Sequence, residues 1–143
     1  MVTSAESESG IAWAGEAKNP RPIKVLVVDH NPILLQGIAV LIRSQPDMKL
    51  VGATGGAAEA IALHRETSPD VTVIDLELSA GSRKIIRGIL SVEPHAKLIG
   101  LTTCELDRSG NEALPAGVRA VLAKDRLELT LAPLIRQQMR PAA

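Results

Sequence analysis

Aromatic side chains are almost missing from the sequence: its 143 residues include no Phe, no Tyr and a single Trp. A surface on which nucleic-acid bases or sugars stack needs several aromatic rings, so this class of binding site is excluded. The single cysteine, Cys104, likewise excludes an internal disulfide framework and a paired-cysteine metal or redox site. No apolar run approaches the roughly 18 residues of a membrane-spanning helix, and the N-terminus lacks a basic segment followed by an apolar one. We therefore expect a soluble, cytoplasmic protein without a membrane partner.

Net charge is missing as well, because 16 basic and 16 acidic side chains cancel. Without a positive field or a helix-turn-helix pattern, direct DNA binding is not expected. What the chain does have is 45% hydrophobic residues, nearly all of them Val, Ile, Leu and Ala. That content is typical of a folded protein, and at this length it predicts one domain rather than two.

The beginning of the chain differs in composition from the rest. Residues 1–22 are rich in Ser, Glu, Ala and Gly and end in Asn-Pro-Arg-Pro. A segment of this kind buries too little apolar surface to order itself. We predict a flexible N-terminal arm over residues 1–22 and a single folded domain over residues 23–140.

From residue 23 onward, apolar runs of strand length alternate with helical patterns. The expected strands cover residues 23–28, 48–54, 71–75, 97–101 and 118–123. The expected helices cover residues 32–45, 56–66, 82–92 and 107–116, and a last helix begins after Thr130 as N-cap and ends near Met139. This alternation predicts an α/β fold in which helices cover both faces of a parallel sheet, with the doubly wound strand order 2-1-3-4-5.

Four polar residues stand where the predicted strands end: Asp29, Asp75, Thr102 and Lys124. In parallel sheets of this kind, functional groups gather beyond the carboxyl ends of the strands. Two carboxylates about 5 Å apart repel each other by about 3 kcal/mol at an effective dielectric constant of 20, so they favour a cation such as Mg²⁺ between them. One carboxylate, Asp75 by its central position, can then attack a phosphoryl group whose oxygens Lys124 and Thr102 contact.

The sequence resembles the receiver domain of bacterial two-component response regulators, closest to the LuxR-type subgroup. The matching stretches are KVLVVDHNPILLQGIAVLI, PDVTVIDLELSAGS, LIGLTTCE and AGVRAVLAKD. The resemblance implies a flavodoxin-like (βα)5 fold, a sensor histidine kinase or phosphotransfer protein as phosphodonor, and a downstream protein as target. It implies no enzymatic activity beyond slow self-dephosphorylation.

The same resemblance implies a role for individual residues. Asp75 would be the phosphoacceptor, Asp29 an acid of the metal pocket, Thr102 the switch hydroxyl and Lys124 the phosphate-pairing lysine. The main-chain carbonyl of Glu77 would complete the metal ligands together with Asp29 and Asp75.

Several positions depart from the pattern of the family. His30 replaces the second acid after the first strand, and since imidazole is a poor Mg²⁺ ligand we expect Mg²⁺ binding to weaken by at least about tenfold. Val121 replaces the aromatic switch residue, and Ser79 replaces a proline after the phosphoacceptor. His64 and His95 show no ligand spacing, and we expect both at the surface.

Two functions remain open at this point. The first is a receiver that is phosphorylated on Asp75 and signals through protein–protein contacts with weakened metal dependence. The second is a degenerate pseudo-receiver, an interaction module that acts without phosphorylation. The sequence ends at Ala143 without a C-terminal DNA-binding domain, so it is a stand-alone receiver or a fragment of a longer regulator. Leu131, Leu134 and Ile135 are apolar enough for a homodimer contact, or they belong to the core.

Overall fold

Five parallel strands form the centre of the protein. Its structure is a computed structural model, which describes residues 21–78, 80–103 and 115–141. The strands are β1 (Ile23–Val28), β2 (Met48–Thr54), β3 (Val71–Asp75), β4 (Lys97–Thr102) and β5 (Val118–Ala123). They pair in the order β2-β1-β3-β4-β5, and all four pairings are parallel. The predicted flavodoxin-like topology is therefore confirmed.

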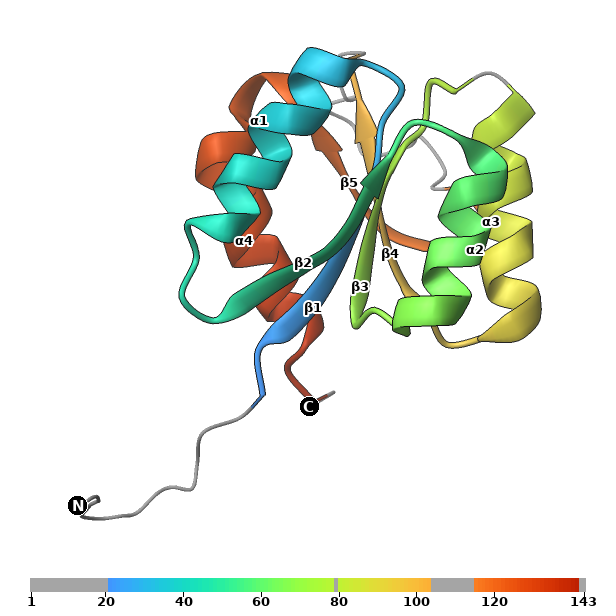
Figure 1. Cartoon of the computed structure of the whole chain (residues 1–143). Coiled ribbons are helices and arrows are strands. Elements are labelled where there is room, and N and C mark those ends of the chain that lie inside the picture. Colours follow the sequence, from blue (N-terminus) through green and yellow to red (C-terminus); the bar gives the residue numbers. More distant parts are fainter. Residues whose placement is uncertain (1–20, 79, 104–114, 142–143) are drawn as a thin grey trace, which may run out of the picture.

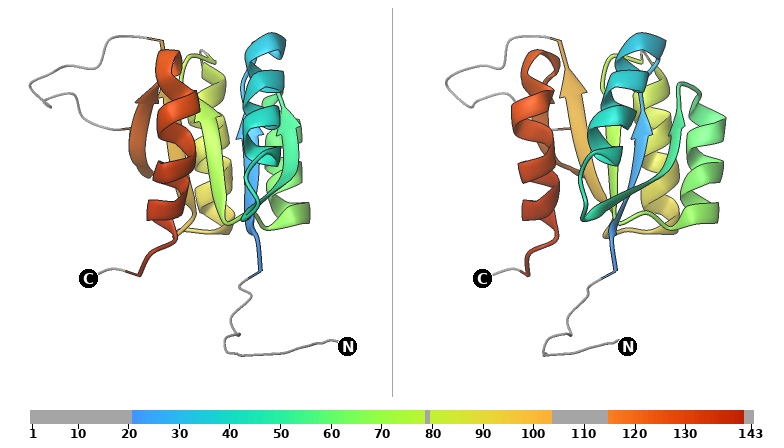
Figure 2. Two further views of the ribbon diagram at one scale, coloured as in Figure 1. Left: turned by 90° about the vertical axis from the view of Figure 1, so that its left-hand side faces the viewer. Right: turned by 60° about the vertical axis from the view of Figure 1, so that its left-hand side comes forward.

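Helices cover both faces of this sheet (Figure 1). Helix α1 (Pro32–Arg43) and helix α4 (Leu127–Gln138) lie on one face, and α2 (Ala57–Thr67) and α3 (Ala80–Val92) lie on the other. Figure 2 turns the molecule so that α1 and α4 come to the front, with α2 and α3 behind the sheet. Most of the helix expected over residues 107–116 lies outside the described residues.

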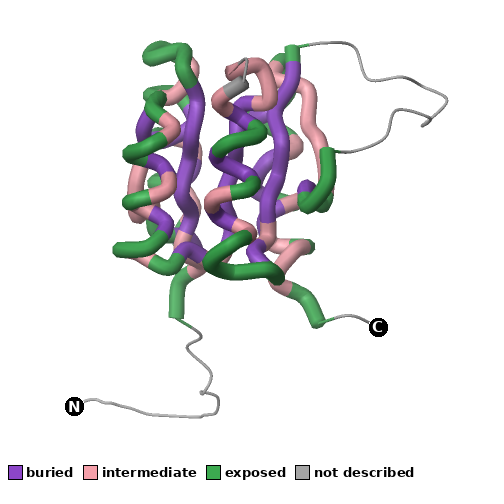
Figure 3. Tube along the Cα trace, turned by 90° about the vertical axis from the view of Figure 1, so that its right-hand side faces the viewer, coloured by how far each residue is buried: buried purple, intermediate pink, exposed green. Residues whose placement is uncertain are grey.

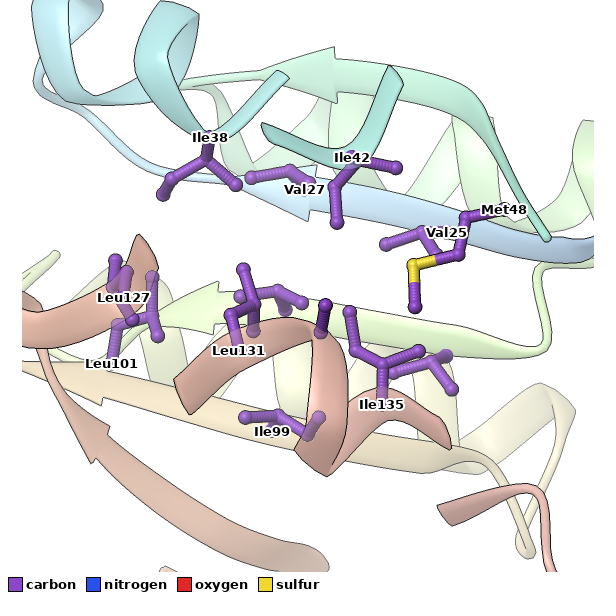
Figure 4. Packing of buried hydrophobic residues seen from close by; sticks show 13 residues of the cluster. Val25, Val27, Ile38, Ile42, Met48, Ile99, Leu101, Leu127, Leu131 and Ile135 are labelled. Atoms are coloured by element: carbon purple, nitrogen blue, oxygen red, sulfur yellow. The ribbon is translucent and has the colours of Figure 1, made fainter. Parts of the chain in front are cut away.

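The two faces of the sheet carry two separate apolar clusters, and the central strands β1, β3 and β4 between them are buried along most of their length (Figure 3). On the α1/α4 face the cluster joins side chains of both helices to the sheet (Figure 4). Its members on the helices are Ile38, Ile42, Leu127, Leu131, Ala132 and Ile135. Because β1, β3 and β4 are covered from both sides, their carboxyl ends are held at fixed positions at the upper edge in Figure 1.

The last helix begins earlier than the sequence analysis predicted. Thr130 is not its N-cap: the helix starts at Leu127, directly after a 3-10 turn over Lys124–Arg126, and the Thr130 hydroxyl donates to the carbonyl oxygen of Arg126 at 3.0 Å. Pro133 consequently lies inside the helix rather than in its first turn. The reason is burial, because Leu127, Leu131 and Ile135 recur every four residues and all three pack into the core.

The expectation that His64 lies at the surface is wrong. His64 is only 3% exposed, and its Nε2 atom lies 3.3 Å from Oε1 of Glu93. Burial lowers the pKa of His64, and the nearby Glu93 carboxylate only partly offsets this. His64 thus belongs to the packing of the α2/α3 layer. His95, in contrast, is exposed as expected.

The described part of the chain begins at Arg21, inside the predicted arm. The Arg21 guanidinium donates two hydrogen bonds to the Asp70 carboxylate, at 2.8 and 2.9 Å, and Asp70 also accepts from the backbone N–H of Lys24. Residues 1–20, which make up the rest of the predicted arm, lie outside the described residues. Within the described residues no helix combines the length and the apolar character that crossing a membrane requires.

The packing of α4 is tested by replacing Leu131 with Ala. Leu131 is fully buried, whereas Leu129 on the same helix is 71% exposed. We expect Leu131→Ala to lower the free energy of unfolding by about 2–5 kcal/mol because it leaves a cavity, and Leu129→Ala to change it by less than about 0.5 kcal/mol. Urea unfolding followed by circular dichroism measures both, and equal effects of the two variants would contradict the packing described here.

Candidate functional site

The four residues predicted at the strand ends lie at one edge of the sheet. Asp29 follows β1, Asp75 ends β3, Thr102 ends β4, and Lys124 follows β5. Both aspartates are fully buried, and the side chain of Lys124 is only 9% exposed. The sheet order thus brings together groups that are up to 95 residues apart in sequence, the separation of Asp29 and Lys124.

The ammonium group of Lys124 lies between the two aspartates. Its Nζ atom is 3.1 Å from Oδ2 of Asp29 and donates to Oδ1 of Asp75 at 3.0 Å. Burial alone would lower the pKa of Lys124, but its hydrogen bond to Asp75 and its charge interactions with both carboxylates outweigh burial and raise it. Oδ2 of Asp29 is buried and accepts no well-aligned hydrogen bond from the described residues, so its contact with Lys124 is that of an ion pair.

Asp75 is held from three sides. Its Oδ1 atom accepts from Lys124 and from the backbone N–H of Glu77 at 2.9 Å, while its Oδ2 atom accepts from Nδ1 of His30. Burial raises the pKa of Asp75, but the hydrogen bonds from Glu77, His30 and Lys124 together lower it below the ordinary value. Asp75 is therefore an ionised carboxylate at neutral pH.

His30 occupies the position where the family pattern has a second acid. Its side chain is 55% exposed, yet the ring is turned inward: Nδ1 contacts Asp75 and lies 3.9 Å from Oδ1 of Asp29. The backbone beside it is fixed, since the N–H of Asn31 donates to Asp29 at 2.8 Å and the Asn31 side chain caps α1. The loop therefore presents the imidazole to both carboxylates.

The side chain of Glu77 is a part of the site that the sequence analysis missed. Its carboxylate accepts from the hydroxyl of Thr102 at 3.2 Å and from the backbone N–H of Thr103 at 2.9 Å. The Thr103 hydroxyl adds contacts of 2.7 and 2.9 Å, and Lys124 Nζ lies 4.0 Å away. The hydrogen bonds from Thr103 and Thr102 lower the pKa of Glu77. The sequence did contain a signal for these contacts: Glu77 is an acid two residues after Asp75, and Thr102 and Thr103 stand side by side where β4 ends.

A divalent cation fits this edge of the sheet in part. Asp29, His30 and Asp75 offer ligand atoms that all lie within 4.8 Å of one another. The two carboxylates are hard oxygen donors of the kind that Mg²⁺ prefers, and the carbonyl of Glu77 could add a third oxygen. The imidazole of His30 does not fit Mg²⁺, because nitrogen ligands suit borderline transition ions better.

The other departures from the family pattern lie beside the site. Val121 is half-buried and packs against the cluster on the α2/α3 face. Because it is a valine, this position has no aromatic ring. Ser79 lies outside the described residues.

Replacing Lys124 with Met tests the role of the buried ammonium. The pKa of Asp75 is expected to rise, because its carboxylate stays buried and loses its cation. The ionised form of Asp75 stabilises the fold at pH values above the ordinary carboxyl range, and this stabilisation is lost as the pH falls through the lowered folded pKa. In the variant this loss begins at a higher pH.

The measurement is an NMR titration of the aspartate carboxyl carbons. Lys49→Met, at an exposed lysine on β2, is the matched control and should leave the titration of Asp75 unchanged. If the pKa of Asp75 is the same in Lys124→Met and in the unmodified protein, the ion pair does not set it.

The chain is similar to proteins of known type. The model of the response regulator receiver domain family matches residues 25–135. The chain is 32% identical over 126 residues to the uncharacterized transcriptional regulatory protein YxjL of Bacillus subtilis, which covers 87% of this chain and 58% of YxjL. It is 30% identical over 115 residues to the DNA-binding transcriptional activator DevR/DosR of Mycobacterium tuberculosis, which covers 80% of this chain and 53% of that protein.

A solved structure agrees with these matches. The two-component response regulator of the LuxR family from Aurantimonas sp. SI85-9A1 shares 28% sequence identity and has a TM-score of 0.71, over 81% of this chain and 84% of that one. The chain spans a little more than half the length of YxjL and of DevR/DosR. With the family model matched over most of the fold, the chain belongs to the family of response regulator receiver domains of two-component systems.

Proposed function

We propose that this receiver domain accepts a phosphoryl group on Asp75 and signals through protein–protein contacts in the cytoplasm, with weak dependence on Mg²⁺. The observation that carries the proposal is the ionised, buried Asp75 carboxylate held against Lys124 at the carboxyl edge of the sheet. A sensor histidine kinase or a phosphotransfer protein is the proposed donor. The downstream partner would be a protein that recognises the changed surface.

The transfer needs one oxygen of Asp75 to be accessible. Oδ1 already accepts hydrogen bonds from Lys124 and from the backbone of Glu77, so Oδ2 is the attacking oxygen. Its contact with His30 must open first, and the exposed His30 side chain has room to turn away. As Oδ2 attacks phosphorus, the new O–P bond forms while the N–P bond of the donor phosphohistidine breaks, and the released imidazole nitrogen takes up a proton.

The residues around Asp75 would then hold the transferred group. Lys124 would pair with its oxygens, and the hydroxyl of Thr102 would donate to one of them after leaving Glu77. When bound, Mg²⁺ supplies positive charge that neutralises these oxygens; Asp29, Asp75 and the main-chain carbonyl of Glu77 would hold it. Since His30 takes the place of a direct carboxylate ligand, we propose that this contribution is weak.

A second candidate function has support in two contacts. His30 covers Oδ2 of Asp75, and Glu77 engages Thr102, so both the nucleophile and the switch hydroxyl are already occupied by groups of the chain itself. A pseudo-receiver that binds its partner without phosphorylation would have this arrangement permanently. We favour phosphorylation because both contacts involve partly exposed side chains that can move.

Incubation with a small acyl-phosphate donor and Mg²⁺ distinguishes the two functions. Intact-protein mass spectrometry should show the gain of one phosphoryl group, which is absent in Asp75→Ala. Asp125→Ala, at an exposed aspartate directly after Lys124, is the control and should still gain the group. No gain in the unmodified protein, even at high Mg²⁺ and after long incubation, would establish the pseudo-receiver instead.

The contact of Glu77 with the threonines makes a prediction of its own. In Glu77→Gln the oxygens of the incoming group no longer compete with a charged acceptor for Thr102, Thr103 and Lys124. Phosphorylation by the small donor should therefore become roughly ten times faster, which is the change expected when one charge-assisted hydrogen bond no longer has to be broken. The control is Glu66→Gln, an exposed glutamate on α2, which should keep the original rate. A Glu77→Gln rate no higher than that of the control would show that the Glu77 carboxylate does not compete with the phosphoryl group.

A further inference from the structure

We propose that the pocket of Asp29, His30 and Asp75 selects a divalent transition ion of the zinc class over Mg²⁺, with Nδ1 of His30 as a direct ligand. A role of such an ion in signalling rests on the proposed function, which this inference deepens. The metal binding itself is measurable without any phosphorylation. Four parts of the pocket's chemistry support this assignment: the direction of the imidazole, the spacing of the donor atoms, the charge of the pocket and the preference of each ligand type.

The first part is the direction in which His30 points. A side chain that is 55% exposed could place its ring in solvent, yet Nδ1 is turned onto Asp75 and lies 3.9 Å from Asp29. The loop beside it is fixed by the hydrogen bond between Asn31 and Asp29, and by the cap that Asn31 forms on α1. The ring nitrogen is therefore presented to both carboxylates by a fixed backbone.

The second part is the spacing of the donor atoms. In a tetrahedral zinc site with metal–ligand distances of about 2.0–2.2 Å, neighbouring ligand atoms lie about 3.3 Å apart. Nδ1 is 3.9 Å from Oδ1 of Asp29 and within hydrogen-bond distance of Oδ2 of Asp75, and all three ligand atoms lie within 4.8 Å. Small side-chain movements would reach the zinc geometry. The ion would take the place of the hydrogen that Nδ1 donates to Asp75, and this hydrogen would move through solvent to Nε2, so that the bound imidazole stays neutral.

The third part is the charge of the pocket. The carboxylates of Asp29, Asp75 and Glu77 face a single ammonium, that of Lys124, which lies within 4.0 Å of all three. Two negative charges therefore remain uncompensated in this cluster when His30 is neutral. A divalent cation would balance both, which an additional hydrogen bond cannot do.

The fourth part separates the candidate ions. Mg²⁺ prefers six hard oxygen ligands and retains several waters, so a nitrogen in place of a carboxylate oxygen is a poor exchange. Zinc and its neighbours in the transition series accept imidazole and carboxylate together. Three protein ligands would leave a fourth position open, which is the arrangement of zinc sites that also bind water or substrate.

The test measures Zn²⁺ and Mg²⁺ affinities by competition titration on the metal-free, untagged full chain and on three variants. His30→Ala should weaken Zn²⁺ binding by at least about tenfold. His30→Asp should strengthen Mg²⁺ binding and lower the ratio of Zn²⁺ to Mg²⁺ affinity by at least about tenfold. His95→Ala, at an exposed histidine far from the pocket in sequence, should change neither affinity. Co²⁺ provides a spectroscopic readout, since the visible bands of a low-coordinate cobalt site should appear in the unmodified protein and be lost in His30→Ala.

Each outcome decides one claim. A ratio that His30→Asp leaves unchanged, or Zn²⁺ binding that disappears in His95→Ala, overturns the metal assignment even if Asp75 is phosphorylated. A ratio that changes as expected supports the assignment. If Asp75 then accepts no phosphoryl group with either ion, the proposed function fails while the metal site stands.

Discussion

The ammonium group of Lys124 between the carboxylates of Asp29 and Asp75 is the interaction on which this edge of the sheet depends. Each carboxylate is fully buried, and a buried ion costs several kcal/mol unless it is paired. Asp29 and Asp75 come from the adjacent strands β1 and β3, whereas Lys124 follows β5 and reaches them past β4. The strand order thus determines that a long cationic side chain closes the pocket, and its hydrogen bond and charge help to lower the pKa of Asp75.

Two further residues complete the pocket from within the chain. His30 contacts the second oxygen of Asp75, and Glu77 accepts from Thr102 and Thr103. Both contacts engage groups that a phosphoryl transfer would use, and both side chains are partly exposed. The pocket therefore has a resting arrangement in which side chains of the protein itself occupy Asp75 and Thr102. A ligand must offer better interactions than His30 and Glu77 to replace them.

The sequence was sufficient to predict the sheet, because continuous apolar runs mark strands covered on both faces. The ends of those runs placed Asp29, Asp75, Thr102 and Lys124 at one edge, which the structure brings together. The start of α4 was predicted wrongly, because a threonine before a proline resembles a helix start, whereas the buried spacing from Leu127 extends the helix backwards. The burial of His64 depends on packing between two helices, and the contacts of the Glu77 side chain depend on the position of a neighbouring strand end. Neither is encoded in local periodicity.

The most direct test of the central claim is to locate the phosphoryl group chemically. Borohydride reduction after incubation with a phosphodonor converts an aspartyl phosphate to homoserine, and peptide mass spectrometry then identifies the modified position. The account predicts homoserine at position 75 in the unmodified protein and far less of it in Lys124→Met, in which the paired cation is lost. Modification at another residue, or equal modification of position 75 in both proteins, would contradict it.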